Sequence, residues 1–387
     1  MNAPRTQTVE LLERLIGFDT TSRNSNLELI HWAEDYLKAR GVASELMFDE
    51  TGTKANLWAT IGPADVPGVM LSGHSDVVPV DGQDWQSDPF RMEERDGLLY
   101  GRGTADMKGF IAICLSHVDD FLAADLKTPV HLAFSYDEEV GCLGGRQLAG
   151  MLKGLDVKPR LCVVGEPTMM GVVIGHKGKA SWRCTVRGHE VHSSLTNKGV
   201  NAVEYAAELI AAIRALAHEK RDRGPFDTAF DPPYTTVHTG VVQGGTALNI
   251  VPKACEFLWE IRNLPADDLD TMYAGVEAKA AELEAEMQKI RPDAGIEMER
   301  ISWFAGLGTA EDDDAVGLGK AFAQSNTIAK VSFGTEAGHY HDAGVPTIVC
   351  GPGDIEQAHK PDEFVALDQI AKCEDFFGRL IAWAEQN

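Results

Sequence analysis

Apolar residues recur in two spacings along the first half of the chain. Positions three and four residues apart predict amphipathic helices, and short continuous apolar runs predict strands that are covered on both faces. Helices that alternate with strands indicate an α/β fold with a central, largely parallel mixed sheet. The expected helices lie at about 7–17, 26–40, from 107 onward, 144–153 and 366–385, and the expected strands at about 54–61, 68–72, 129–135, 160–164 and 346–350.

The pattern changes near residue 180, where residues 181–188 alternate strictly between apolar and polar. Strict alternation predicts a strand with one buried face. The elements that follow give the order β-α-β-β-α-β, a split βαβ unit that forms a complete small α+β domain. We therefore expect an α/β domain formed by residues 1–178 and 304–387, interrupted by an inserted α+β domain at 179–303. The later inserted elements are expected at about 200–219 (helix), 235–242 and 253–262 (strands), 267–289 (helix) and 296–302 (strand).

Composition excludes several classes of protein. The chain has 387 residues, 44% of them apolar, and no apolar run long enough to cross a membrane. The formal charge of −24 argues against nucleic acid or a membrane surface as a partner. The first residues lack the features of a signal peptide, and the seven cysteines are odd in number and form no CxxC pair. These features favour reduced thiols and a cytoplasmic protein.

Histidine and acidic residues follow several of the expected strands. In an open α/β sheet the carboxyl ends of parallel strands share one crevice, so these side chains are expected to meet there. So many carboxylates would repel each other unless a cation neutralised them. The residues are His74 and Asp76, then Asp137, Glu138 and Glu139, then Glu166, then Asp354, Glu356 and His359, with Asp106 in the glycine-flanked loop GRGTADMKG.

The composition of this set predicts a pair of divalent metal ions. Two histidines with several carboxylates and no cysteine suit zinc first, and cobalt or manganese as alternatives. Five ligands are too many for one catalytic zinc, but they fit two metals about 3.5–4 Å apart that share a carboxylate. Asp106 is the expected bridge, because its glycine-flanked turn can bring the backbone between two sites.

The remaining acids near the expected strand ends are assigned to supporting roles. Asp76 lies two residues after His74 and can accept the other ring N–H of that histidine. Glu138 and Glu139 are adjacent, so their side chains diverge and only one is expected to bind metal. The other is expected to act as a general base toward water.

The other motifs in the chain do not indicate a further catalytic or metal site. His189 and His192 in GHEVH miss the HExxH spacing, and His339 and His341 in GHYH are expected in a loop. No G-x-S-x-G and no phosphate-loop pattern occurs in the chain.

Seven motifs together resemble a known family, the M20-type metallopeptidases and deacylases, which includes aminoacylase-1, carboxypeptidase G2, succinyl-diaminopimelate desuccinylase and acetylornithine deacetylase. The similarity covers nearly the whole chain in the same order, and residues 333–364 resemble the acetylornithine deacetylases most. The motifs are GHSDVVP, GRGTADMKG, the DEE of 137–139, GEPT, AHKPDEF and, in the inserted domain, GGTALNIVP and WEIRNLP.

This resemblance implies a role for each matching residue. His74 and Glu166 would bind one metal, Glu139 and His359 the other, and Asp106 would bridge them. Glu138 would be the general base, Asp76 would support His74, and a cis peptide bond would follow Asp106. In the inserted domain, which would serve as a lid and dimerisation domain, His192 would donate to the oxyanion, and Asn249 and Arg262 would hold the substrate carboxylate. Glu336 would favour a cationic substrate side chain.

The activity implied is hydrolysis of an N-acyl amino acid, N-acetyl-L-ornithine to L-ornithine and acetate in arginine biosynthesis, by a cytoplasmic homodimer. Other family activities stay open, namely those of a desuccinylase, a general aminoacylase or a dipeptidase. A catalytically silent metal-binding scaffold is a further alternative, but it would have no use for Glu138. A two-metal phosphoesterase is a third, but it would show more Arg or Lys beside the ligands.

Overall fold

The computed structural model describes residues 3–387, which form two compact units. Unit 1 contains the chain up to Gly175 together with Leu307–Lys330 and Thr335–Asn387. Unit 2 contains His176–Gly306 and Val331–Gly334. Among residues 3–387, no helix has the length and apolar character that crossing a bilayer requires.

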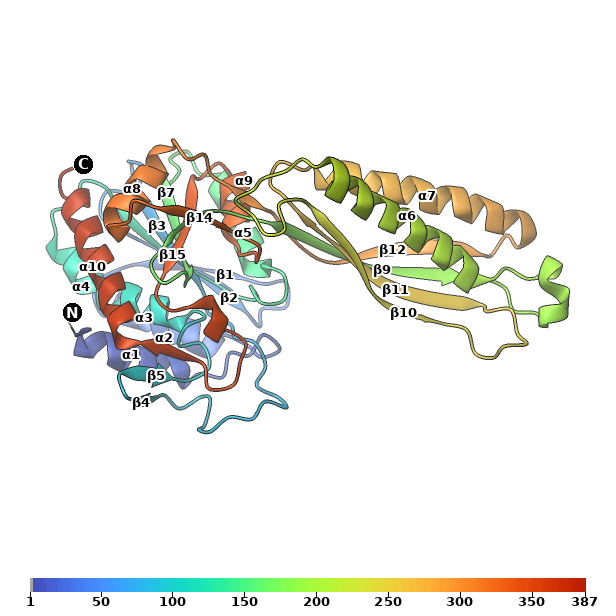
Figure 1. Cartoon of the computed structure of the whole chain (residues 1–387). Coiled ribbons are helices and arrows are strands. Elements are labelled where there is room, and N and C mark those ends of the chain that lie inside the picture. Colours follow the sequence, from blue (N-terminus) through green and yellow to red (C-terminus); the bar gives the residue numbers. More distant parts are fainter. Residues whose placement is uncertain (1–2) are drawn as a thin grey trace. The chain divides into compact units, whose positions relative to one another are not determined.

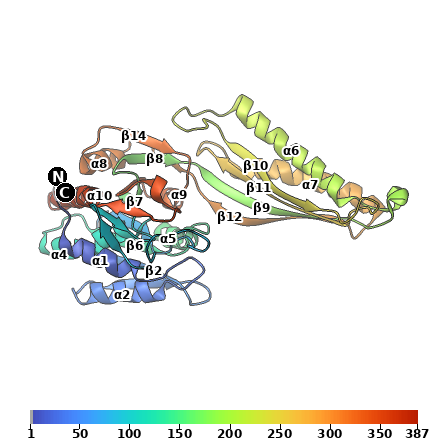
Figure 2. The ribbon, with the colours of Figure 1, turned by 60° about the horizontal axis from the view of Figure 1, so that its bottom comes forward.

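Unit 1 is built on a nine-stranded mixed sheet with the order β1-β2-β6-β3-β7-β15-β8-β13, and β14 pairs with β8. Figure 2 shows β2, β6, β7, β8 and β14 in this succession across the sheet. The central neighbours β6, β3, β7 and β15 run parallel, while β1, β2 and β8 pair antiparallel. The strands are β1 (Ser44–Phe48), β2 (Ala55–Ile61), β3 (Val69–His74), β6 (Val130–Ser135), β7 (Leu161–Pro167), β8 (Val172–His176), β13 (Leu307–Gly308), β14 (Ile328–Val331) and β15 (Thr347–Gly351).

Every residue of the four central strands is buried. This burial on both faces explains why their sequences are continuous apolar runs rather than alternating ones. The prediction of a largely parallel mixed sheet with helices is therefore confirmed.

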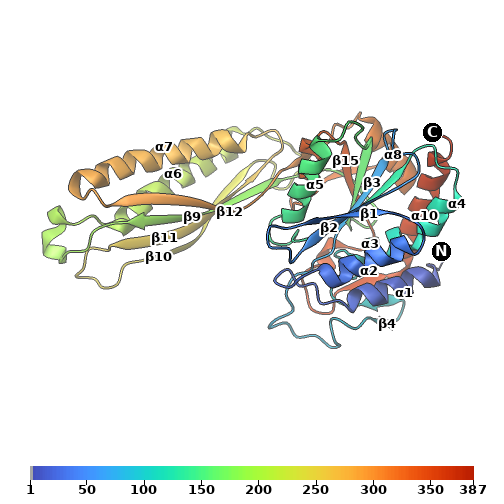
Figure 3. The same ribbon diagram turned by 180° about the vertical axis from the view of Figure 1, so that it is seen from behind.

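Helices cover both faces of this sheet. Figures 1 and 3 show α5 on the opposite side of the sheet from α1, α2 and α3. All nine residues of α3 are buried, because α1 and α10 pack against it on the side away from the sheet. The helices are α1 (Thr6–Ile16), α2 (Leu27–Lys38), α3 (Lys108–Ser116), α4 (Val118–Ala123), α5 (Leu143–Lys153), α8 (Asp314–Ala323), α9 (Ala337–Asp342) and α10 (Leu367–Ala384).

A second, small antiparallel sheet in unit 1 has the order β16-β5-β4. Its strands are β4 (Glu93–Arg95), β5 (Leu98–Tyr100) and β16 (Phe364–Ala366).

Unit 2 is a four-stranded antiparallel sheet with the order β10-β11-β9-β12. Its core alternates as the sequence pattern indicates, and Trp182 stacks on Trp259 with ring centroids 4.4 Å apart. Two long helices, α6 and α7, lie side by side on one face of this sheet (Figures 1 and 2). The elements are β9 (Gly178–Arg187), a 3-10 turn (Ser193–Lys198), α6 (Ala202–Arg223), β10 (Thr236–Gly244), β11 (Ala254–Asn263), α7 (Leu269–Ile290) and β12 (Gly295–Phe304).

Several short elements were not predicted. The strands β8, β13 and β14 and the helices α8 and α9 have between two and ten residues. Short segments span too few turns or alternations to establish a period. The GHYH segment at 338–341, expected in a loop, belongs to α9, so that expectation was wrong.

Candidate metal centre

The carboxyl ends of the central parallel strands bring the predicted acids and histidines together. His74 is the last residue of β3, Glu166 lies near the end of β7, and Glu138 and Glu139 follow β6. The ligand atoms of His74, Asp106 and Glu139 lie within 4.8 Å of one another, as do those of His74, Glu138 and Glu166.

Asp106 lies between the two histidines. Its Oδ1 is 2.9 Å from His74 Nε2, and its Oδ2 is 3.4 Å from His359 Nε2. One carboxylate therefore turns a different oxygen toward each imidazole, as a bridging ligand would. The peptide bond between Asp106 and Met107 is cis, as the family resemblance implied.

The other two acids divide between the histidines in the same way. Glu166 Oε1 is 3.6 Å from His74 Nε2, and Glu139 Oε2 is 3.0 Å from His359 Nε2. The structure thus places Glu166 beside His74 and Glu139 beside His359. Glu138 also comes close to His74 and Glu166, so distance alone does not separate a base from a ligand at this position.

The tautomer of His74 suits metal binding. Its Nδ1–H donates to the backbone carbonyl of Asp76 at 2.9 Å. Nε2 points toward the oxygens of Asp106 and Glu166. Burial opposes protonation of the ring, but the hydrogen bonds with Asp106 and Asp76 raise the pKa of His74. A bound cation would take the place of the Nε2 proton, and a carbonyl on the second ring nitrogen is a common support for a histidine ligand.

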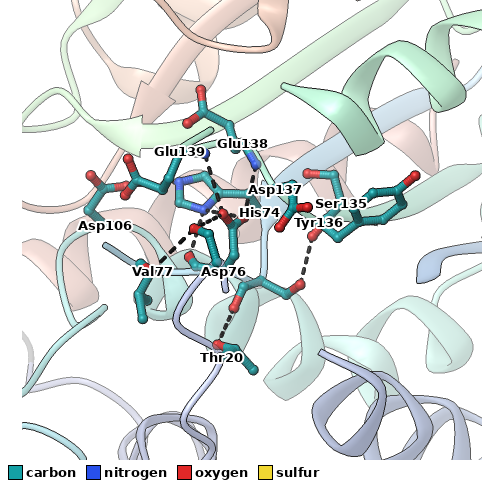
Figure 4. Close-up of polar contacts among 12 residues, drawn as sticks. Thr20, His74, Asp76, Val77, Asp106, Ser135, Tyr136, Asp137, Glu138 and Glu139 are labelled. Carbon is teal, nitrogen blue, oxygen red and sulfur yellow. Dashed lines mark hydrogen bonds and ion pairs between the residues drawn. The ribbon is translucent and has the colours of Figure 1, made fainter. Parts of the chain in front are cut away.

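The Asp76 side chain accepts hydrogen bonds that the sequence did not indicate. Its Oδ1 lies 3.5 Å from His74 Nδ1, whereas it accepts the backbone N–H of Glu138 at 3.0 Å. Its Oδ2 accepts the N–H of Glu139 at 3.3 Å and the hydroxyl of Ser22 at 2.7 Å. Figure 4 shows these bonds running from the turn with Glu138 and Glu139 to the Asp76 carboxylate. Asp76 thus holds that turn against the histidine.

Burial raises the pKa values of Glu138, Glu139 and Glu166, whereas the pKa of Asp106 is lowered because, against the effect of burial, His359 and His74 hydrogen-bond its carboxylate. The pKa of Glu139 rises to about 7, first through burial and then through the charge of Asp106. The pKa values of Glu138 and Glu166 are raised well above their usual range, again chiefly by burial. The pKa of His359 rises to about 10 through its hydrogen bonds with Asp106 and Glu139. Crowded, buried carboxylates of this kind need a cation to stay ionised together, so the set fits divalent metal ions.

Glu336 lies within the interior of unit 1. The side chain is fully buried, Ser72 donates to its Oε1 at 2.8 Å, and Ser135 donates to its Oε2 at 2.7 Å. Burial raises its pKa, although these hydroxyls oppose the rise. The carboxylate is therefore not presented to a substrate in this structure.

The residues predicted in the inserted domain belong to unit 2. Both His192 and Asn249 are exposed, and Ser193 N–H donates to the Asn249 carbonyl at 3.0 Å, so the two lie on adjacent segments. His192 Nδ1 accepts the N–H of Ser194 at 3.2 Å, which leaves the ring proton on Nε2. Arg262 lies near the end of β11, where its Nε donates to Glu260 at 2.9 Å.

Glu363 and Arg102 were missed by the sequence analysis. They form a buried ion pair of 2.7 Å beside the loop that carries Asp106. The signal was present in the motif AHKPDEF, which has an acid four residues after His359, but nothing in the sequence pattern shows that this acid is buried.

Comparison with known proteins identifies a matching family and several similar proteins. The family model described as "Peptidase family M20/M25/M40" matches residues 70–383 of this chain. Acetylornithine deacetylase of Myxococcus xanthus is 36% identical over 383 residues and covers 96% of each chain. The acetylornithine deacetylase of Proteus mirabilis is 33% identical and covers 98% of this chain and 97% of its own.

Solved structures share the fold. An M20 family metallo-carboxypeptidase from Sulfolobus solfataricus has a TM-score of 0.77 at 15% identity, and covers 99% of this chain and 100% of its own. A dinuclear metal binding peptidase of the M20 family from Bacillus subtilis has a TM-score of 0.66 at 15% identity, and covers 98% of both chains.

Proposed function

This chain belongs to peptidase family M20/M25/M40 and is a metal-dependent amidohydrolase, and we propose that it hydrolyses N-acetyl-L-ornithine to L-ornithine and acetate. The position of Asp106 is the observation that carries the proposal, because its two oxygens face different histidines. The relatives named acetylornithine deacetylase, with 32–36% identity, supply the substrate.

The ligand set is proposed as two groups that share Asp106. His74 and Glu166 hold one ion, and Glu139 and His359 hold the other. Zinc suits these ligands best and cobalt is the alternative, because both accept imidazole and carboxylate. Two bound cations would polarise the amide carbonyl and favour ionisation of the attacking water.

Glu138 is proposed as the residue that moves the proton. Its carboxylate takes a proton from water as the oxygen attacks the acetyl carbon, and then gives that proton to the ornithine nitrogen as the C–N bond breaks. The base needs to start ionised and to hold the proton until the amine leaves. A buried carboxylate with a raised pKa meets both needs once a neighbouring cation offsets part of that rise.

The lid residues support a homodimer with shared sites. Asn249 and His192 lie beyond the start of β11, whereas Arg262 is the ninth of its ten residues. At about 3.3 Å per residue, this strand separates them by more than about 25 Å. Residues so far apart in unit 2 cannot hold one acetylated amino acid, so a site that uses both groups would take them from two chains. His192 would then donate its Nε2–H to the developing oxyanion in the partner.

Selection of the ornithine side chain is proposed to act through charge at a distance. Glu336 is buried with both oxygens occupied by hydroxyl groups, so it contributes its electrostatic field rather than a direct ion pair. Cytoplasmic location and a role in arginine biosynthesis stay predictions that follow from the substrate.

The activity is tested on protein stripped with a chelator and reconstituted with zinc or cobalt. We expect no turnover without metal, recovery with up to two ions per chain, and the highest kcat/KM on N-acetyl-L-ornithine in a panel with succinyl-diaminopimelate, acetyl-methionine and a dipeptide. Full turnover by the stripped protein would refute the metal mechanism. Preference for another member of the panel would keep the amidohydrolase and replace the substrate.

A further inference from the structure

Glu363 is a buried carboxylate at the base of the loop that carries Asp106. It is 1% exposed, and its Oε1 accepts the backbone N–H of Ala105 at 2.9 Å and of Asp106 at 3.0 Å. Its Oε2 accepts the N–H of Gly103 at 3.0 Å and Nη1–H of Arg102 at 2.7 Å. One side chain therefore holds most of the backbone N–H groups of the segment that leads into the bridging residue.

The same network reaches the loop of His359. Arg102 Nη1 also donates to the Lys360 carbonyl at 3.2 Å, and its Nη2 donates to Gln83 Oε1 at 2.6 Å. Gln83 Nε2 in turn donates to the backbone carbonyl of His359 at 2.9 Å. Glu363 and Gln83 thus connect the two ligand-bearing loops through a single guanidinium group.

These loops need such a connection more than the other ligands do. His74 and Glu166 belong to β3 and β7, whose backbone positions are fixed by hydrogen bonds within a fully buried sheet. Asp106 and His359 follow no strand directly, and His359 has a positive φ of 64°. Hydrogen bonds to a charged, buried carboxylate are stronger than neutral ones, so one carboxylate can hold both loops.

We infer that Glu363, with Arg102 and Gln83, is a positioning residue that sets Asp106 and His359 at the spacing of the metal ion held by His359 and Glu139. The inference rests on the proposed two-metal function. It assigns the network no contact with substrate. Its loss should weaken the ion at His359 more than the ion at His74, because only the first depends on both loops.

The experiment measures stepwise zinc binding to the stripped full-length protein by competition with a chromophoric chelator. Glu363→Gln keeps the shape of the side chain. Its NH₂ group, however, would face two of the four N–H groups from which the Glu363 carboxylate accepts hydrogen bonds, so these two bonds would be lost. Gln83→Ala removes the contact to His359 and leaves the buried carboxylate intact. Residues that support metal ligands in this way typically contribute about 10–100-fold in affinity. We expect a loss of this size in one binding step for Glu363→Gln and a smaller loss in the same step for Gln83→Ala.

Each variant has a matched control. Asp267→Asn alters a buried carboxylate of unit 2 that pairs with Lys220 at 2.6 Å. Gln147→Ala removes an amide that donates to the Phe48 carbonyl at 2.8 Å in unit 1. Neither contacts a proposed ligand, so both should lose stability without losing metal affinity. His359→Ala identifies which binding step belongs to the His359 position.

The outcomes separate the inference from the function on which it rests. If wild type binds two ions and both Glu363→Gln and Gln83→Ala bind them as tightly, the positioning role is overturned and the proposed function stands. Equal losses in the control variants would overturn it in the same way. If Glu363→Gln does not fold, Gln83→Ala decides. Wild type that takes up fewer than two ions overturns the proposed function and the inference together.

Discussion

The side chains of Glu138 and Glu139 contact different residues. Glu139 lies 3.0 Å from His359 and within the group formed with His74 and Asp106. Glu138 accepts a hydrogen bond from the Cys142 thiol at 3.4 Å and lies in the group formed with His74 and Glu166. The backbone of both is held by Asp76, so their side chains diverge from a fixed turn.

Glu138→Gln tests the division of roles at this turn. The amide has nearly the same shape but cannot take a proton from water. Metal content should stay near wild type, while kcat falls by at least about 10²–10⁴-fold, the usual contribution of a general acid–base group. Metal content measured by atomic emission and kcat measured on the same preparation give the answer. Glu139→Gln is the matched control and should lose metal. Loss of metal from Glu138→Gln as well would make Glu138 a ligand.

His117 lies outside the metal centre and makes the free energy of unfolding depend on pH. Its Nδ1–H donates to the Ile113 carbonyl at 2.9 Å, and among residues 3–387 its Nε2 has no hydrogen-bond partner. Its ring lies beside Phe121 and Phe377. Burial lowers its pKa from 6.5 to about 4. The folded protein therefore favours the neutral ring, whereas the unfolded chain binds a proton once the pH falls below about 6.5.

The resulting prediction concerns His117→Gln, which cannot titrate. The free energy of unfolding of wild type should fall relative to the variant as the pH drops from 6.5 to 4, by at most about 3 kcal/mol. Urea unfolding of both metal-free proteins at several pH values measures that difference. A difference that stays constant from pH 7 to pH 4.5 would show that the ring titrates normally in the fold.

At the scale of elements, hydrogen bonds anchor the start of α9 to two of the central strands. Glu336 precedes α9 and accepts hydroxyls from Ser72 of β3 and Ser135 of β6. The charge of Glu336 also contributes to the raised pKa of Glu138, after burial and other charges. Glu336, at the start of α9, thus places a negative charge beside two central strands without exposing it to substrate.

This charge should affect substrate choice modestly. Wild type is expected to prefer N-acetyl-ornithine over N-acetyl-norvaline, which lacks the cationic end. Glu336→Gln should reduce the ratio of the two kcat/KM values by up to about 17-fold, since a unit charge at about 10 Å and an effective dielectric of about 20 contributes roughly 1.7 kcal/mol. The ratio cancels changes in chemistry that both substrates share. Equal kcat/KM values for wild type would remove the charge-based reason for naming ornithine.

At the scale of the whole molecule, unit 2 carries its candidate groups at opposite ends of one sheet. His192 and Asn249 lie past the start of β11, and Arg262 lies near its end. The sheet also has two edge strands, β10 and β12, each paired on one side only within residues 3–387. Edge strands offer a pairing surface to a second copy. These features support a dimer that shares its sites.

Mixing defective chains tests this arrangement. His192→Ala should lower kcat by about 10²–10³-fold, the usual loss for one oxyanion donor, and leave metal binding intact. When His192→Ala chains exchange subunits with Glu138→Gln chains, each mixed dimer should contain one site with both groups, so activity should reappear. Heterodimers demonstrated by mass spectrometry that stay inactive would exclude donation by His192 to the partner site.

What the sequence by itself determined was the local periodicity of the long elements and the residue types at the ends of the buried strands. Continuous apolar runs predicted the central strands, and parallel strands bring their carboxyl ends to one edge, so the meeting of His74, Glu138 and Glu166 followed from order alone. The tertiary structure decided which groups face each other. Asp76 turns to the backbone of Glu138, and Glu363 turns to the Asp106 loop, more than 250 residues away in the chain. Such contacts leave no local period, because they form between segments that only the packed sheet brings together.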